Sequence, residues 1–302
     1  MRCLSLTSAL LLLSVSSYPT HRQTLFRRGV TLESVKKDNF NTYTIPLGYH
    51  DKLQLNPKDS VIIHGSNAIE HTVNLIDESG VIGRRVLVVC GWNVCRVDPL
   101  MWELEPRDYE IWVESISSEP SPDDVGRLVN EAMVNSIDII FAMGGGSVVD
   151  ACKAAVTILR NRRFPEHESV PWLKLFQGIF ESDEIDYLAG GQRPLLVTVP
   201  IMPLIGSEVN QFSCILPPSP PTPSEIMLKD YIRTVHPDIC VIQPNSFFRL
   251  PMSLLHDRIV SLFSLAVELL ILYDDFRITY TALDSIKKLS PILLSSMKVI
   301  RF

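Results

Sequence analysis

The sequence predicts an α/β protein: a doubly wound parallel sheet followed by the start of an all-helical domain. Two observations carry this prediction. Short, continuous apolar runs, typical of strands buried on both faces, alternate with helical stretches up to about residue 244. From Leu250 onward only long apolar helical stretches remain, so we expect a boundary near Asn245.

The composition limits the classes of protein to which this chain can belong. It has 302 residues, of which 46% are hydrophobic and 21% are charged, and its formal net charge is −6. That is enough apolar chain to bury one large core or two smaller ones, which excludes a disordered protein and a small disulfide-stapled scaffold. Because an acidic chain binds phosphate backbones poorly, we expect no nucleic acid partner.

The first part of the sheet is expected between residues 60 and 113. A short β-rich run covers residues 60–64, and apolar side chains at helical spacing predict a helix over residues 69–76. The continuous apolar run at residues 86–90 is typical of a strand buried on both faces. Residues 111–113 predict a further strand.

The next helix is predicted to begin at Ser121. This serine is a suitable N-cap, Pro122 suits the first helical position, and Asp123 and Asp124 lie at the positive end of the helix dipole. The apolar residues that follow keep the spacing of one buried face: Val125, Leu128, Val129, Ala132 and Met133. We therefore expect this helix to cover the sheet.

Three more apolar runs complete the sheet. Residues 137–143, 194–199 and 239–242 each predict a strand, and a helix over residues 148–159 follows the first of them. Because strands and helices alternate, the sheet should be parallel and covered on both faces.

The N-terminal residues 1–37 are typical of a targeting segment. An apolar run, Leu4 to Val15, follows one arginine and precedes the small residues Ser16 and Ser17. Arginines without acidic residues continue through residue 32. A signal peptide followed by a transit peptide predicts a plastid-like organelle reached by the secretory route. The alternatives are a mitochondrial presequence, secretion, and an N-terminal apolar helix packed on the domain.

The rest of the chain divides into two parts. We assign residues 38–244 to the α/β domain and residues 245–302 to an incomplete helical region. No other window approaches the ~18 consecutive apolar residues of a membrane span, so we expect no span in the mature chain.

A glycine-rich turn, Gly144-Gly145-Gly146-Ser147, stands between a predicted strand and a predicted helix. Glycines let the backbone approach a ligand closely, and the N–H groups at a helix start suit phosphate. The turn matches neither the Walker A pattern nor GxGxxG. It indicates an anion site in a Rossmann-like domain, with a nucleotide pyrophosphate as the expected ligand. The alternative is a tight turn in which Ser147 caps the helix and Asp150 completes a capping box.

Two further segments follow predicted strands. Residues 199–209 read VPIMPLIGSEV, at the carboxyl edge where ligands bind such sheets, and residues 237–244 read PDICVIQP before Leu250-Pro251. With the loop MGGGSVVDACKA at residues 143–154, these segments resemble, in this order, the iron-containing alcohol dehydrogenase family. That family is similar to glycerol dehydrogenase and, more distantly, to dehydroquinate synthase. The resemblance covers roughly residues 60–290.

The resemblance implies an NAD(P)-dependent, metal-assisted alcohol or aldehyde oxidoreductase. It implies that the dinucleotide is held by Gly144, Gly145, Gly146, Ser147, Asp150, Lys153, Gly206 and Ser207. The family often ends its first strand with an Asp that binds the adenine ribose, and here Gly91 follows that strand. Without that acid a 2′-phosphate is not repelled, so NADP is permitted as well as NAD.

The sequence departs from the family pattern at two places. Residues 201–205 replace hydroxyl-bearing and small residues with apolar ones, which cannot make polar contacts to a cofactor. In the helical region the resemblance aligns Ser261 with an Asp ligand of the family metal and Leu265 with a His ligand. The two remaining histidines would lie beyond Phe302, as expected for a divergent, C-terminally truncated member.

Iron or zinc, the family metal, is therefore not expected to bind here, because serine and leucine supply neither an anionic nor an imidazole ligand. His256 and Asp257 are no replacement, since adjacent residues point about 100° apart on a helix.

Oxidoreductase is the best family description, with weak or no alcohol dehydrogenase activity expected of this chain. The alternatives are a non-catalytic nucleotide-binding or interaction module derived from the family, and a degenerate copy without a ligand. The expected partner is a small-molecule dinucleotide. Apolar residues surround the predicted helix at residues 260–272, which predicts an exposed apolar surface and hence a homodimer or a protein partner.

Overall fold

The computed structural model of the chain describes residues 41–44, 61–79, 83–91, 97–117, 119–161, 194–216, 230–247, 250–272 and 276–299. The targeting segment expected at residues 1–37 lies outside these ranges.

A seven-stranded sheet with the order β1-β2-β9-β6-β5-β3-β4 forms the centre of the molecule. Its strands are β1 (Asn41–Thr44), β2 (Val61–His64), β3 (Arg85–Gly91), β4 (Glu110–Ile116), β5 (Ile139–Gly144), β6 (Leu195–Pro200) and β9 (Ile239–Ile242). All neighbouring strands run parallel except β1, which pairs antiparallel with β2 at the edge. The predicted parallel sheet is thus confirmed, and the antiparallel edge strand is an addition.

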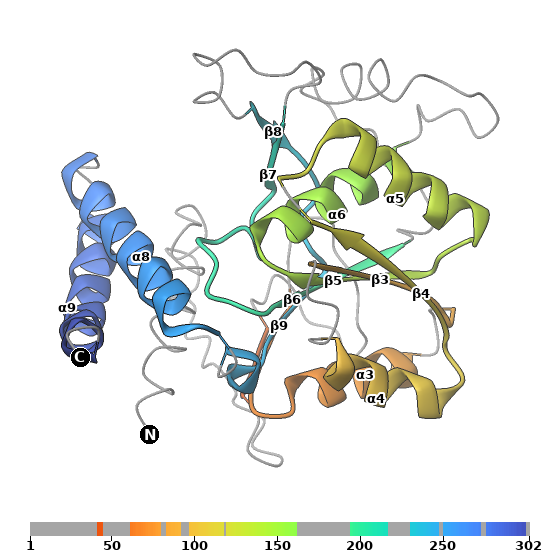
Figure 1. Cartoon of the computed structure of the whole chain (residues 1–302), viewed down its shortest axis with the longest axis horizontal. Coiled ribbons are helices and arrows are strands. Elements are labelled where there is room, and N and C mark those ends of the chain that lie inside the picture. Colours follow the sequence, from red (N-terminus) through yellow and green to blue (C-terminus); the bar gives the residue numbers. More distant parts are fainter. Residues whose placement is uncertain are drawn as a thin grey trace, which may run out of the picture.

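Helices cover both faces of this sheet (Figure 1). They are α3 (Ala68–Ser79) and α4 (Asp98–Leu104) on one face, and α5 (Pro122–Val134) and α6 (Gly146–Leu159) on the other. Successive side chains of β3 point to opposite faces, so Leu87 joins the core under α5 and α6 whereas Val88 joins the core over α3 and α4. The fold is therefore the doubly wound α/β arrangement that the alternating pattern predicts.

The start of α5 agrees with the sequence in detail. Ser121 accepts a hydrogen bond from the Asp124 backbone N–H (3.2 Å), and the Asp124 carboxylate accepts one from the Ser121 backbone N–H (3.0 Å). This is a complete capping box with Pro122 at the first helical position. The predicted buried face is wrong at Met133, which lies in the last turn with 37% of its surface exposed.

The chain after β9 is helical. A short 3₁₀ helix, η3 (Pro244–Phe247), leads into α8 (Met252–Leu272), which packs along α9 (Phe276–Val299) beside the sheet (Figure 1). A third apolar cluster joins these helices to the sheet, with Ile62 and Cys240 on the strands and Leu262 and Leu289 on the helices. Among the described residues, none of the helices combines the length and apolar character that a bilayer crossing needs.

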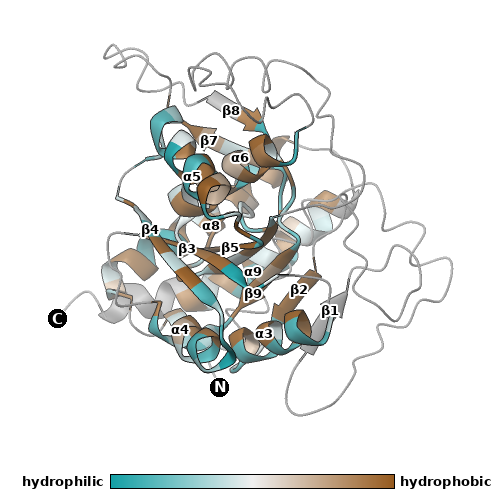
Figure 2. Cartoon of the chain, turned by 90° about the vertical axis from the view of Figure 1, so that its right-hand side faces the viewer, coloured by the Kyte–Doolittle hydropathy of each residue, from teal (hydrophilic) through white to brown (hydrophobic). Residues whose placement is uncertain are grey.

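Hydropathy follows the layers. In Figure 2 the central strands are mostly hydrophobic, whereas α3, α4 and α5 also carry hydrophilic residues.

Two short strands, β7 (Phe212–Ile215) and β8 (Asp230–Arg233), form a separate antiparallel pair. β7 contacts α6, and this contact ties the chain after β6 to the helix that follows the glycine turn.

Candidate functional site

Two loops meet at the carboxyl edge of the sheet. The glycine turn follows β5, and the segment Ile201–Asn210 follows β6, whose last residue Pro200 pairs with Gly144 of β5. The Ile201 N–H donates a hydrogen bond to the Gly144 carbonyl (3.2 Å), so the backbones of the two loops are joined. In parallel sheets this edge is where ligands bind.

The glycine turn requires glycine at its first position and is open at its third. A Cβ at Gly144 would lie 2.6 Å from Val148 Cγ2 and 2.7 Å from Val148 Cβ, distances that a folded chain does not accommodate. A Cβ at Gly145 would lie 3.5 Å from the Met202 side chain, and one at Gly146 would meet no atom within 4 Å. The turn is thus tight against its own helix and accessible at Gly146.

The N-terminus of α6 offers unpaired donors. Its N-cap is Gly145, which has no side chain to satisfy the first N–H groups. The first helical hydrogen bond runs from Val149 N–H to the Gly145 carbonyl (3.2 Å), and among the described residues no acceptor pairs with the N–H groups of Gly146 and Ser147. Together with the positive end of the helix dipole, these donors suit an anion.

The alternative explanation of this turn, a capping box made by Ser147 and Asp150, is wrong. Gly145 is the N-cap and Ser147 lies one residue inside the helix. The Asp150 carboxylate instead accepts hydrogen bonds from the Ser207 hydroxyl (2.6 Å) and from the Cys214 backbone N–H (3.1 Å). Its partners therefore lie on the chain after β6.

Lys153 is fully buried, and its partners, like those of Asp150, lie on the chain after β6. Its ammonium donates to the Ser207 carbonyl (3.0 Å), the Ser207 hydroxyl (3.2 Å), Asn210 Oδ1 (3.2 Å) and the Phe212 carbonyl. It also pairs with Asp150 Oδ1 at 3.1 Å. Burial lowers the pKa of Lys153, and the Asp150 charge opposes that shift. Asp150 and Lys153 thus fasten residues 207–214 to α6, so that their head groups position this segment.

Gly206 begins the fastened segment in a conformation that favours glycine. Its φ is 88°, and its carbonyl accepts hydrogen bonds from the N–H groups of Val209 (3.1 Å) and Asn210 (3.0 Å). The predicted site residues Gly144–Ser147, Asp150, Lys153, Gly206 and Ser207 are therefore brought together by the loops after β5 and β6.

Glu208 is a buried acid that the predicted set of site residues omits. Its Oε2 has no hydrogen-bond partner among the described residues, and burial raises its pKa to about 6 although the Lys153 charge lowers it. The only sequence signal was its place in the Gly-Ser-Glu-Val match at residues 206–209. Its backbone carbonyl accepts a hydrogen bond from the Thr198 hydroxyl of β6 (3.0 Å), so the residue lies against the sheet.

The apolar part of the second loop packs inward. Ile201, Pro203 and Leu204 are buried, and Met202 is half-buried against the core and close to Gly145. Polar contacts to a ligand are thus available from the main chain of the glycine turn and not from the side chains of residues 201–204.

The positions aligned with metal ligands carry no ligand set. The Ser261 hydroxyl donates to the Asp257 carbonyl of its own helix (2.8 Å), and Leu265 is apolar. The described part of the chain holds no group of three or more His, Cys, Asp or Glu residues that could bind a metal. These residues do not fit an iron or zinc site, and the loss of the metal stays a prediction.

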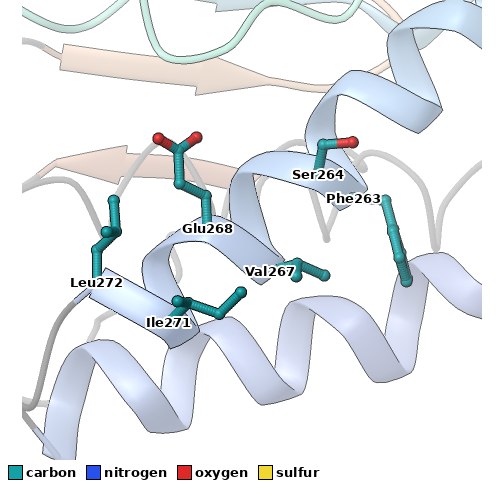
Figure 3. A pocket seen from close by; sticks show the side chains of 6 residues that line it. All are labelled: Phe263, Ser264, Val267, Glu268, Ile271 and Leu272. Carbon is teal, nitrogen blue, oxygen red and sulfur yellow. The ribbon is translucent and has the colours of Figure 1, made fainter.

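An open groove of about 460 Å³ lies along α8, and its lining is largely apolar (Figure 3). It is lined by Phe263, Ser264, Val267, Glu268, Ile271 and Leu272. Among the described lining residues Glu268 is the single ionisable group, and the others are Ser264 and four apolar residues.

Gly91 ends β3 at the same edge of the sheet as the glycine turn, two strands from β6. A Cβ there would meet no atom within 4 Å. A Cβ at this position would therefore meet no described neighbour.

Comparison with known proteins identifies the family of this chain. A family model described as iron-containing alcohol dehydrogenase matches residues 59–244, more than half of the chain. No curated protein sequence matches significantly.

Solved structures share the fold at low identity. The crystal structure of an iron-containing alcohol dehydrogenase is 21% identical, with a TM-score of 0.54 over 76% of this chain and 54% of that one. An NADH-dependent butanol dehydrogenase A from Thermotoga maritima is 20% identical, with a TM-score of 0.53 over 74% and 50% of the two chains. An archaeal alcohol dehydrogenase from a Red Sea brine pool is 18% identical, with a TM-score of 0.58 over 82% and 64%. The chain spans about half the length of the first two structures.

Proposed function

Because the chain belongs to the iron-containing alcohol dehydrogenase family, we propose that its α/β domain binds a nicotinamide dinucleotide, NADP or NAD, at the glycine turn. The observation that carries this proposal is the start of α6. A tight glycine turn lies at the carboxyl edge of a parallel sheet, and its N–H groups at Gly146 and Ser147 have no acceptor among the described residues. This geometry fits a pyrophosphate, since two adjacent donors and the helix dipole face an accessible position.

Two groups of residues would have different roles in binding the dinucleotide. The main chain of Gly146 and Ser147 would hold the pyrophosphate, and the open position at Gly146 would let it approach. Asp150 and Lys153 would not contact the ligand but would hold Ser207 and Asn210 in place. When bound, the dinucleotide would supply the hydride chemistry of the family.

The metal-dependent part of the family's chemistry is not proposed for these residues. Ser261 and Leu265 stand where the resemblance places an Asp and a His ligand, and neither side chain binds iron or zinc. Without a Lewis acid, hydride transfer loses several kcal/mol of transition-state stabilisation. We therefore expect weak or no alcohol dehydrogenase activity.

A second candidate function follows from the same residues. A non-catalytic nucleotide-binding or interaction module would keep the turn at Gly144–Ser147 and need no metal ligands. The apolar groove on α8 and the exposed Ile271 and Leu272 favour this candidate, because they offer a surface to a second copy or a protein partner.

Calorimetric titration of the purified chain with NADH and NADPH tests the proposal. We expect saturable binding of at least one of them, with competition by inorganic pyrophosphate, and no stoichiometric iron or zinc by metal analysis. Absence of binding at millimolar dinucleotide would overturn the binding function. A tightly held equivalent of metal, with alcohol oxidation that a chelator abolishes, would overturn the predicted loss of the metal site.

The targeting proposal rests on the sequence of residues 1–37 alone. A fluorescent protein fused behind these residues should enter a plastid-like organelle by the secretory route. Mitochondrial or secreted fluorescence would favour one of the alternatives.

A further inference from the structure

Met202 occupies an unusual place in the molecule, because it packs against three separate apolar clusters. One cluster lies under α5 and α6, one over α3 and α4, and one joins the sheet to α8 and α9. The residue is only half-buried, so part of its side chain reaches the surface. It therefore lies where the cores of the α/β domain and of the helix pair meet.

The same side chain lies beside the glycine turn. Met202 Sδ and Cε are both 3.5 Å from the position of a Cβ at Gly145, which is ordinary van der Waals contact. At Gly146 the corresponding space is empty to 4 Å. One side of the turn is thus accessible, and the other is filled by a thioether.

The backbone beside Met202 is tied to the glycine turn. The Ile201 N–H donates a hydrogen bond to the Gly144 carbonyl (3.2 Å), and this bond holds the start of the loop against the turn. Methionine has three flexible side-chain torsions and fills irregular space easily. Its tip can therefore leave Gly145 by a change of rotamer.

A pyrophosphate that accepts hydrogen bonds from the N–H groups of the turn at about 2.9 Å needs space next to the turn for its two phosphoryl groups. The Met202 thioether lies beside Gly145 and takes part of that space. We propose that Met202 is a movable apolar plug at the dinucleotide site, and that pyrophosphate binding requires its side chain to leave Gly145. This inference rests on the proposed function and adds a residue that sets the affinity of the site.

The plug has a simple effect on affinity. If the open rotamer is populated about one tenth of the time in the free protein, the apparent Kd is about tenfold higher than that of an open site. A residue that instead contacts the bound dinucleotide favourably would have the opposite effect when truncated.

The test compares three variants of the full chain in titrations with NADH, NADPH and inorganic pyrophosphate. Met202→Ala removes the plug, and Met202→Val shortens it while keeping more of the apolar packing. Met101→Ala is the matched control, because Met101 is also half-buried and packs against a core cluster, but on α4. Circular dichroism confirms that each variant is folded.

We expect Met202→Ala and Met202→Val to bind dinucleotide and pyrophosphate about tenfold more tightly than the unsubstituted chain, with Met101→Ala unchanged. If Met202→Ala does not fold, Met202→Val decides. Unchanged or weaker binding by the folded variants would overturn the plug, and the proposed function would stand as long as the unsubstituted chain binds. If no form binds, both proposals fail. If only the Met202 variants bind, the plug is supported and the binding function proposed for the unsubstituted chain fails.

Discussion

The helices α6 and α8 are both rich in apolar residues but are buried to very different extents. In α6, 11 of 14 residues are buried, Lys153 among them. In α8, only three of 21 residues are buried: Ile259, Leu262 and Ala266. The difference lies in the neighbours. α6 packs between α5, β7 and the sheet, whereas the described part of the chain covers α8 mainly along α9.

This contrast predicts that substitutions in the two regions have different effects. On α6 the buried Asp150 and Lys153 are paired, and they hold the chain after β6 to the helix at the carboxyl edge of the sheet. Around α8 an apolar groove is open, and Ile271 is 75% exposed. We expect substitutions around α6 to change stability and ligand binding, and substitutions on α8 to change association.

The largest effect is expected at Asp238. Its carboxylate accepts hydrogen bonds from Arg160 Nη2 (2.5 Å) and from the Leu196 N–H (2.7 Å), in full burial. Asp238→Ala leaves a buried guanidinium without its charge partner and should lower the free energy of unfolding in urea by about 3–5 kcal/mol.

The control for this prediction lies in the helix pair. Asp284 pairs with Lys288 on α9 (2.7 Å), and both side chains are partly exposed. Asp284→Ala should cost about 0.5 kcal/mol or less. Equal losses in the two variants would contradict the distinction between the two regions.

The next effect concerns Glu208, beside Lys153. Since its pKa is raised to about 6 in the folded state from an ordinary value of 4.5, its neutral form favours folding. This contribution is present below pH 4.5 and is lost as the pH rises through 6, a change of roughly 2 kcal/mol. Glu208→Gln should therefore remove this part of the pH dependence of urea unfolding.

Glu268→Gln is the matched control, because it makes the same change of charge on the exposed surface of α8. If Glu208→Gln unfolds with the same pH profile as the unsubstituted chain, the environment of Glu208 is not the dry one that the packing around α6 implies.

A smaller effect is expected at Gly91, which has open space at its Cβ. Gly91→Asp has open space for its Cβ and would place a carboxylate at the end of β3. It should weaken NADPH binding about tenfold relative to NADH, because the carboxylate repels a 2′-phosphate. Asn130→Asp on the exposed surface of α5 adds the same charge and should not change the ratio of the two Kd values.

The smallest effect on stability is expected at Ile271. Ile271→Lys should change the free energy of unfolding by about 0.5 kcal/mol or less, because the side chain is exposed. It should shift the chain to a smaller species in size-exclusion chromatography with light scattering if a second copy covers α8. Val134→Lys, at a position 81% exposed on α5, should leave the elution unchanged. Identical elution of both variants would count against a homodimer through α8.

Local patterns were read correctly from the sequence where the partners are close along the chain. The buried runs of β3, β5 and β9 and the capping box of Ser121 and Asp124 depend on residues within one element. Ser147 and Asp150 show the same local spacing, yet Asp150 pairs with Ser207, 57 residues away. The fold brings Ser207 to Asp150, and this distant partner takes the place of Ser147. The local sequence pattern cannot show which of the two partners Asp150 binds.

The sequence predicts part of the candidate site as well. Its glycines follow from the turn and from the resemblance, and their place at the carboxyl edge follows from the alternation of strands and helices. The sequence does not predict that Lys153 holds residues 207–212 or that Met202 lies beside Gly145. They require the register of β5 with β6, which sets the two loops side by side.

The central claim is that the glycine turn binds the dinucleotide, and a substitution at Gly146 tests it most directly. Gly146→Val adds a side chain in open space, so the urea unfolding midpoint should not fall, but the added methyl groups would block the approach to the turn. We expect the Kd for the better-bound dinucleotide to rise at least about tenfold, equivalent to about 1.4 kcal/mol, with Asn130→Val on α5 unchanged. Equal affinity of Gly146→Val and the unsubstituted chain would contradict the claim.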